Sequence, residues 1–135
     1  MRLDELSRNS NLTGKGGVPS PDVRGLSADS RTVQPGYLFA ALPGTKVDGQ
    51  AFISQAIENG ATAVLASEPL LAQPLHADVA FVTSDNPHRD LAHMAARFFE
   101  FQPVHIGCIT GTNGKTSTAS FLRQLLAAQG HKVAA

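Results

Sequence analysis

The chain has 135 residues, 42% of them apolar and 16% charged, and its formal net charge is 0. This length predicts one domain of ordinary size, or one domain and part of a second. The neutral balance argues against nucleic acid as a partner, because binding a phosphate backbone requires a basic stripe. The only cysteine, Cys108, excludes an internal disulfide and favours a reducing compartment. No run approaches the ~20 apolar residues of a membrane span, so we expect a cytoplasmic protein without a membrane partner.

Short apolar runs alternate with turns through the first hundred residues. Residues 3–7 fit a helical turn, and residues 9–21, rich in Asn, Gly, Ser and Pro, are expected to form a loop. Further along, the pattern predicts short strands at residues 23–28, 37–42, 63–66 and 79–83. A helix from Phe52 ends at Gly60. Asn86 and Pro87 predict the start of another helix, and Gln102-Pro103 marks a domain boundary.

The region that follows, residues 104–122, predicts a strand, a phosphate-binding loop and a helix. A β-branched apolar run breaks at Thr110-Gly111-Thr112-Asn113-Gly114, and Lys115-Thr116 opens a stretch of helical periodicity. Glycines allow a tight turn with the N–H groups pointing inward, and the helix directs its positive dipole end at the same point. The sequence therefore predicts an anion site.

Particular residues of this loop suit a nucleotide that carries Mg²⁺. Lys115 adds a full positive charge towards the outer phosphates, and the hydroxyl of Thr116 or Ser117 can ligate the metal ion. The general phosphate-loop pattern has a glycine where this chain has Ile109, so the match is to a tighter form of the motif. An ordinary strand-to-helix turn explains the glycines but not the Lys-Thr pair.

After the loop, leucines at helical spacing predict a helix that stops at Gly130. The residues from His131 onwards would begin another strand. A parallel strand pair needs its crossover and its second strand, so we expect this chain to be the front part of a longer protein.

A second candidate site consists of two polar turns, at residues 27–32 and 45–49, each after an apolar strand. Loops at strand ends often hold ligands in α/β layers, although Asp-Ser-Arg and Asp-Gly are equally good turn sequences. The five histidines are scattered, which makes a metal cluster improbable. No catalytic triad and no carboxylate pair can be assembled from the spacing.

Taken in order, these motifs resemble the Mur ligases. The resemblance covers residues 22–135 and is strongest to the family members that add the third amino acid of the peptidoglycan stem peptide. The chain departs from the usual pattern at Tyr37 and Ser117. The residues that carry the resemblance are Asp29-Ser30-Arg31, Pro35-Gly36, Gly44, Asp48-Gly49, Phe52-Ile53, Gly60-Ala61, Asp85-Asn86-Pro87 and Thr110 to Thr116.

The resemblance implies an α/β protein in two parts. Residues 1–103 would form a mixed α/β domain that binds the UDP-N-acetylmuramoyl peptide, and residues 104–135 would begin a Rossmann-like ATP-binding domain, incomplete in this chain. By position, the resemblance assigns uridine-nucleotide contacts to Ala28, Ser30, Thr45, Lys46 and Val47. It assigns ATP binding to Gly111, Thr112, Asn113, Gly114, Lys115, Thr116 and Ser117, with Lys115 and Thr116 also catalytic and Thr116 a ligand of Mg²⁺.

The activity that the resemblance implies is ATP-dependent amide-bond formation. The D-glutamyl carboxylate of UDP-N-acetylmuramoyl-L-Ala-D-Glu would become an acyl phosphate, which the amine of meso-diaminopimelate or L-lysine attacks. Catalysis would rest on positioning and charge neutralisation, in a monomer whose partners are these small molecules.

Other interpretations remain open at this point. The sister ligase that adds D-Ala-D-Ala has a similar first domain, and folate polyglutamate synthases share the T-N-G-K sequence without the Asp-Ser-Arg domain. The chain by itself could be a nucleotide-sugar-binding module without catalysis. A GTPase is remote, because no Asn-Lys-x-Asp motif is present.

Overall fold

The computed structural model describes residues 1–8, 13–15, 20–44, 48–69, 78–101 and 103–134. The chain divides into two compact units, Met1–Gln102 and Pro103–Ala135.

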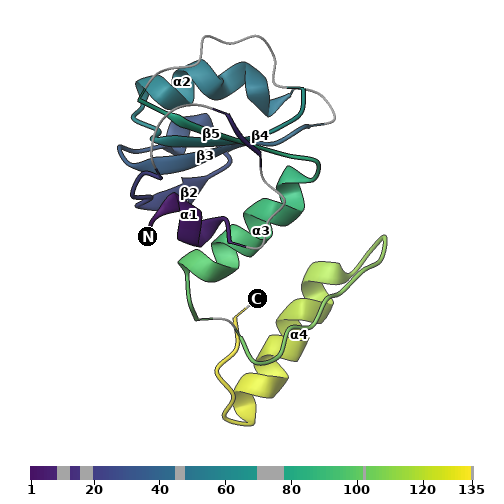
Figure 1. The fold of residues 1–135 in the computed structure, drawn as a ribbon. Helices are drawn as coiled ribbons and strands as arrows, with labels where there is room; N and C mark the ends of the chain where they lie inside the picture. Colours follow the sequence, from purple (N-terminus) through teal and green to yellow (C-terminus); the bar gives the residue numbers. More distant parts are fainter. Residues whose placement is uncertain (9–12, 16–19, 45–47, 70–77, 102, 135) are drawn as a thin grey trace. The chain divides into compact units, whose positions relative to one another are not determined.

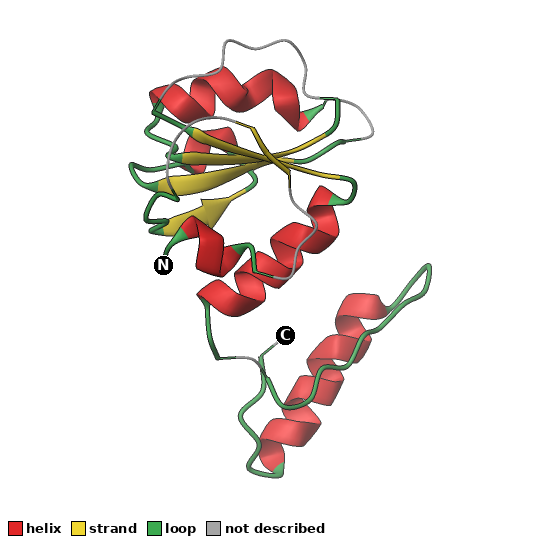
Figure 2. Cartoon of the chain, viewed as in Figure 1, coloured by secondary structure: helices red, strands yellow, loops and turns green. Residues whose placement is uncertain are grey.

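The first unit is built on a five-stranded sheet with the strand order β1-β5-β4-β3-β2. Strands β2 to β5 are parallel to their neighbours, whereas β1 pairs antiparallel with β5 at one edge. This mixed sheet with its helices confirms the α/β class expected from the sequence (Figure 2). The strands are β1 (Thr13–Lys15), β2 (Gly25–Ser27), β3 (Tyr37–Ala41), β4 (Ala63–Ser67) and β5 (Ala80–Ser84).

Helices cover both faces of this sheet (Figure 1). Helices α1 (Leu3–Leu6) and α3 (Pro87–Phe98) lie on one face, and α2 (Ile53–Glu58) lies on the other. Neighbouring side chains of a strand point to opposite faces, so β3 contributes Leu38 to one apolar core and Phe39 to the other. Because both faces are covered, the strands are continuous apolar runs, as parallel sheets require.

Particular residues at the ends of α2 and α3 determine where these helices end and begin. The Asn86 side chain accepts a hydrogen bond from the Arg89 N–H at 3.1 Å, and Pro87 occupies the first turn of α3. Gly60, which follows α2, has φ 97°. A Cβ there would lie 2.8 Å from the Cα of Pro35, so only glycine fits this turn.

Two expectations for the first unit need correction. Residues 13–15 form the edge strand β1 inside the stretch expected to be a loop. They do so by pairing with β5, and nothing in the sequence of the segment itself predicts this pairing. The strand expected from residue 23 begins at Gly25. There the Tyr37 ring packs so closely that a Cβ on residue 25 would lie 2.5 Å from it.

The second unit consists of an extended segment, a loop and helix α4 (Lys115–Ala128). Gly130, at φ 88°, ends the helix as expected. The strand expected over residues 104–109 is not formed: in the described residues of this unit, the segment is extended without a paired neighbour. A strand requires hydrogen bonds from an adjacent strand. Two of its apolar side chains are therefore exposed, Val104 to 90% and Ile106 to 73%.

Candidate functional site

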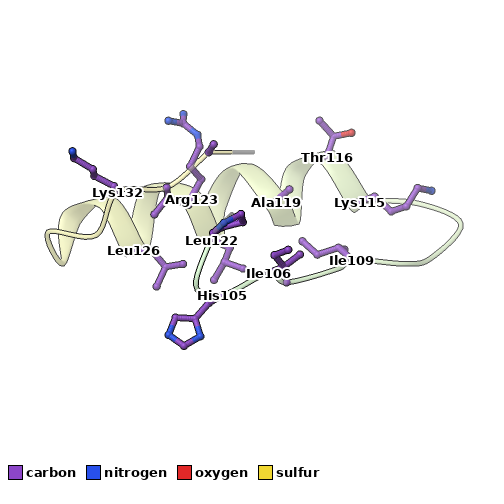
Figure 3. Close-up of a pocket in the computed structure, with 14 residues that line it drawn as sticks. His105, Ile106, Ile109, Lys115, Thr116, Ala119, Leu122, Arg123, Leu126 and Lys132 are labelled. Atoms are coloured by element: carbon purple, nitrogen blue, oxygen red, sulfur yellow. The ribbon is translucent and has the colours of Figure 1, made fainter. Parts of the chain in front are cut away.

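The turn before α4, residues 110–114, is the candidate anion cradle (Figure 3). Gly111 has φ 146° and Gly114 has φ 77°, values that favour glycine over any residue with a side chain. A Cβ on Gly114 would meet no atom within 4 Å, and a Cβ on Gly111 would meet only the Asn113 carbonyl oxygen, at 3.8 Å. The loop can thus approach a ligand closely with its backbone.

Lys115 stands at the first position of α4 and folds its side chain back over this loop. Its Nζ donates to the carbonyl oxygen of Gly111 and, at 3.4 Å, to that of Thr112. The ammonium group is therefore held beside the loop backbone, on the exposed side of the unit. A phosphate bound in the cradle would meet a positive charge that is already in place.

The N-terminus of α4 offers the rest of an anion site. No side chain caps this helix end, and its first turn contains no acidic residue. The first N–H groups of a helix have no partner within the helix, and the macrodipole makes this end positive. Thr116 and Ser117 place two hydroxyl groups in the same first turn. These residues suit a phosphate chain with its metal ion.

Among the residues that the structure describes, no group of three or more His, Cys, Asp or Glu side chains could hold a metal ion. A metal at the loop would therefore depend on hydroxyl groups such as that of Thr116, on phosphate oxygens and on water. Mg²⁺ accepts that kind of environment, since it keeps several waters and binds through substrate phosphates.

A hollow of about 700 Å³ lies beside α4 within the second unit, and Lys115 and Thr116 are among its lining residues (Figure 3). Most of its lining is apolar and includes Ile106, Leu122 and Leu126. Such a lining favours packing by other apolar side chains over phosphate binding. We therefore place the anion site at the loop and the helix end, and not in this hollow.

The first unit has a separate pocket of about 430 Å³, a volume within the usual range for small-molecule sites. It lies where β2 ends and the 3₁₀ turn η1 (Ser30–Thr32) begins, opposite the start of α2. Its lining is Ala28, Asp29, Ser30, Arg31, Phe52 and Gln55. Two residues expected from the sequence, Ala28 and Ser30, are thus brought together, whereas Thr45, Lys46 and Val47 lie outside the described residues.

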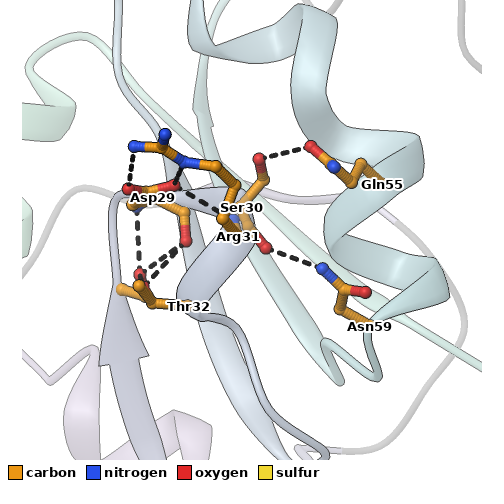
Figure 4. A network of polar contacts seen from close by, with 7 residues as sticks. Asp29, Ser30, Arg31, Thr32, Gln55 and Asn59 are labelled. Carbon is orange, nitrogen blue, oxygen red and sulfur yellow. Dashed lines mark hydrogen bonds and ion pairs between the residues drawn. The ribbon is translucent and has the colours of Figure 1, made fainter.

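An ion pair fixes one wall of this pocket (Figure 4). Arg31 donates to both carboxylate oxygens of Asp29, from Nε at 2.9 Å and from Nη2 at 2.7 Å. These hydrogen bonds lower the pKa of Asp29 from 3.8 to about 2 and raise the pKa of Arg31. Asp29 also caps η1 by accepting from the Arg31 backbone N–H at 3.0 Å.

Helix α2 fixes the other side of the same turn (Figure 4). The Ser30 hydroxyl, on a residue only 6% exposed, donates to Gln55 Oε1 at 2.6 Å. Asn59 Nδ2 donates to the Ser30 carbonyl oxygen at 2.8 Å. The position of Ser30 is therefore set by hydrogen bonds from both ends of the residue.

Sequence reasoning assigned no site role to Phe52 or Gln55. Both belong to an amphipathic stretch whose apolar spacing indicates a core helix, and they lie more than twenty positions from Ser30 in the chain. The one available signal was Phe52, an aromatic residue placed just before a helix; in the structure it is 43% exposed.

Comparison with known proteins places this arrangement in a family. Residues 22–99, more than half of the chain, match the family model described as Mur ligase family, catalytic domain. The chain belongs to the Mur ligase family. The matched residues lie in the first unit and include the Asp29–Arg31 turn and α2.

Curated relatives extend the match to the phosphate loop. A UDP-N-acetylmuramoyl-L-alanyl-D-glutamate--2,6-diaminopimelate ligase of Caulobacter vibrioides is 46% identical over 127 residues, 94% of this chain and 26% of its own length. The ligase of the same name from Brucella melitensis is 40% identical over 134 residues, 99% of this chain and 27% of its own length. Matches of such length in a chain of 135 residues include residues 110–117. The chain spans about a quarter of the length of these relatives.

Solved structures show the same fold. A UDP-N-acetylmuramoylalanyl-D-glutamyl-2,6-diaminopimelate--D-alanyl-D-alanyl ligase of Acinetobacter baumannii matches with TM-score 0.64 at 24% identity, over 93% of this chain and 27% of that one. The MurF ligase of Thermotoga maritima, solved in complex with ADP, matches with TM-score 0.57 at 29% identity, over 78% and 24% of the two chains. In the described part of the present chain, no helix is long and apolar enough to cross a membrane.

Proposed function

We propose that this chain is the part of an ATP-dependent amino-acid ligase that binds the two nucleotide substrates. The ligase acts in peptidoglycan precursor synthesis. The full-length enzyme would join 2,6-diaminopimelate to UDP-N-acetylmuramoyl-L-Ala-D-Glu. The observation that carries the proposal is the glycine-containing loop at the N-terminus of α4, where Lys115 donates to the Gly111 carbonyl oxygen. Relatives at 40–46% identity are named for this reaction.

The second unit holds the phosphates of ATP in this proposal. The N–H groups at the start of α4 and the Lys115 ammonium neutralise phosphate charge, and the Thr116 hydroxyl is the ligand offered to Mg²⁺. When bound, ATP supplies the phosphoryl group that activates the D-glutamyl carboxylate as an acyl phosphate. Catalysis by the loop is then a matter of positioning and charge neutralisation.

The first unit holds the uridine nucleotide in the 430 Å³ pocket, with Ala28 and Ser30 in contact with it. This proposal is supported by the position of the pocket, at the carboxyl ends of parallel strands where α/β sheets generally bind ligands. Thr45, Lys46 and Val47 would complete the uridine site. We propose that the enzyme acts in the cytoplasm, as a monomer, on small-molecule substrates.

The identity of the ligase is tested by product formation in the full-length protein. We expect phosphate release and a UDP-muramoyl tripeptide, seen by mass spectrometry, when ATP, the UDP-muramoyl dipeptide and diaminopimelate are supplied together. L-Lysine in place of diaminopimelate should give little product. Product formed only from the UDP-muramoyl tripeptide and D-Ala-D-Ala would instead identify the sister ligase.

A second candidate function concerns the 135-residue chain alone, as a nucleotide-sugar-binding module. It is favoured by a specific observation: the pocket of the first unit is lined entirely by residues of that unit, whereas the second unit contributes one loop and one helix. We expect the isolated chain to bind the UDP-muramoyl dipeptide in calorimetry without releasing phosphate from ATP.

A further inference from the structure

The pocket of the first unit contains two side chains from the start of α2 that the nucleotide site assigned above does not use. Phe52 ends the 3₁₀ turn η2 (Gly49–Phe52), and Gln55 lies in the first turn of α2. Both line the pocket beside Ala28 and Ser30. Their position follows from the close packing of η2 on the end of β3, where a Cβ on Gly49 would lie 2.6 Å from the Leu42 backbone nitrogen.

Phe52 is an aromatic side chain left 43% exposed at the wall of a pocket. In the part of the chain that the structure describes, its neighbours Ile53 and Ala56 are fully packed into the core beneath α2. The backbone that carries Phe52 is therefore held by a buried framework, while part of its aromatic side chain stays accessible. A flat apolar surface of this kind can stack on the ring of a nucleobase, whichever base it is.

Gln55, in the same pocket lining, supplies a polar group with a defined orientation. Figure 4 shows its hydrogen bond with Ser30. Its Oε1 accepts the Ser30 hydroxyl at 2.6 Å, which turns the Nε2 donors of the exposed amide away from Ser30. An N–H donor recognises a carbonyl oxygen. Uracil carries a carbonyl oxygen at the position where cytosine carries an amino group, so such a donor distinguishes the two bases.

We propose that Phe52 and Gln55 are the base-recognition residues of this pocket: Phe52 stacks on the pyrimidine ring, and Gln55, held by Ser30, donates to the carbonyl oxygen that uracil has and cytosine lacks. The inference rests on the proposed uridine-nucleotide site and adds to it a reason for selecting uridine. The two residues have different effects: stacking on Phe52 raises the affinity for any pyrimidine nucleotide, whereas the Gln55 amide selects uracil over cytosine.

The test is calorimetric titration of the full-length protein and its variants with UDP and with CDP. The wild type should prefer UDP by about 10- to 100-fold, the discrimination expected from well-placed base contacts. Gln55→Ala should bring the two affinities close together. Phe52→Ala should weaken UDP and CDP alike by about 10- to 100-fold, and Phe52→Tyr, which keeps the ring, should restore both.

Glu58→Gln is the matched control, because Glu58 is an exposed residue of α2 outside the pocket lining, and its affinities should equal those of the wild type. Circular dichroism and a thermal melt, recorded for every variant, verify that the protein is folded, and Phe52→Leu provides a second variant of similar bulk without a ring. A full UDP preference in Gln55→Ala, or unchanged affinities in Phe52→Ala and Phe52→Leu, would overturn the inference alone. A wild-type protein that binds neither nucleotide would overturn the uridine site itself.

Discussion

The Asp29 carboxylate accepts three hydrogen bonds from a single residue, Arg31. The conformation of the η1 turn therefore depends on the ionisation of this carboxylate. The pair lies at the surface, so it adds little to global stability. Its effect is local, because the turn that carries Ser30 into the pocket has Asp29 as its cap.

A carboxyl titration tests this coupling. The pKa of Asp29 is lowered to about 2 from an ordinary value of 3.8. A depressed folded-state pKa means that the ionised carboxylate favours the folded turn above about pH 4, and that this contribution is lost as the pH falls towards 2. We expect an NMR titration midpoint for Asp29 near 2, and a rise towards 3.8 in Arg31→Gln. An unchanged midpoint in that variant would show that the ion pair is not the cause.

At this scale the sequence predicts site residues only where the signal lies in the residues next to them. Ala28 and Ser30 are assigned by the family resemblance of their turn, and Lys115 by its position after glycine and before a helix. Phe52 and Gln55 cannot be assigned in this way, because their role depends on α2 lying against η1, a contact that no local pattern encodes. The Ser30–Gln55 hydrogen bond joins residues separated by 25 positions.

At the scale of single elements, α3 shows how local chemistry determines where a helix begins. Asn86 caps it through a hydrogen bond to the Arg89 N–H, and the buried carboxylate of Asp90 in its first turn accepts from the hydroxyl of Ser84. The second contact ties the helix start to the end of β5, because Ser84 is the last residue of that strand. The face of α3 opposite solvent carries Met94, which is fully buried in the sheet core.

Removal of this cap has a predictable cost. Asn86→Ala should lower the free energy of unfolding by about 1 kcal/mol, the usual value for a lost N-cap, because the Arg89 N–H would lose its acceptor. Urea denaturation followed by circular dichroism measures the change. His93→Ala, an exposed substitution on the same helix, should change the free energy by less than about 0.5 kcal/mol. Equal effects of the two substitutions would contradict the assigned role of Asn86.

The strands show which elements could be predicted from local sequence and which could not. The apolar run at residues 37–42 contains its own signal and forms β3. Thr13, Gly14 and Lys15 contain no alternating pattern, and they become a strand only because β5 presents an edge for them to pair with. The reverse holds for residues 104–109, which carry a strong strand pattern and have no partner strand within the described residues of their unit.

At the scale of the molecule, the two units differ in how much of their apolar surface is buried. In the first unit, two apolar clusters sandwich the sheet. In the second, large apolar side chains remain open to solvent: Phe121 is 71% exposed and Leu125 59%. A helix with an exposed apolar face gains little from packing. We therefore expect the second unit to need further chain for its stability.

Hydrogen exchange tests this expectation. In the 135-residue chain, the amides of residues 104–109 should exchange at nearly unprotected rates, whereas those of β4, paired on both sides, should be strongly protected. In the full-length protein the amides of 104–109 should become protected as this segment pairs in a sheet. Strong protection of 104–109 in the short chain would contradict the account.

The central claim is that residues 110–117 hold the phosphates of ATP in a ligase, and Lys115→Ala in the full-length protein tests it most directly. We predict that ATP-dependent ligation, measured by phosphate release, falls by at least about 100-fold, the cost of losing a well-placed electrostatic group. Affinity for the UDP-muramoyl dipeptide should stay within about twofold, because that site is in the other unit. Lys132→Ala, which removes a cation outside the loop, should ligate normally. A normal ligation rate in Lys115→Ala would contradict the claim.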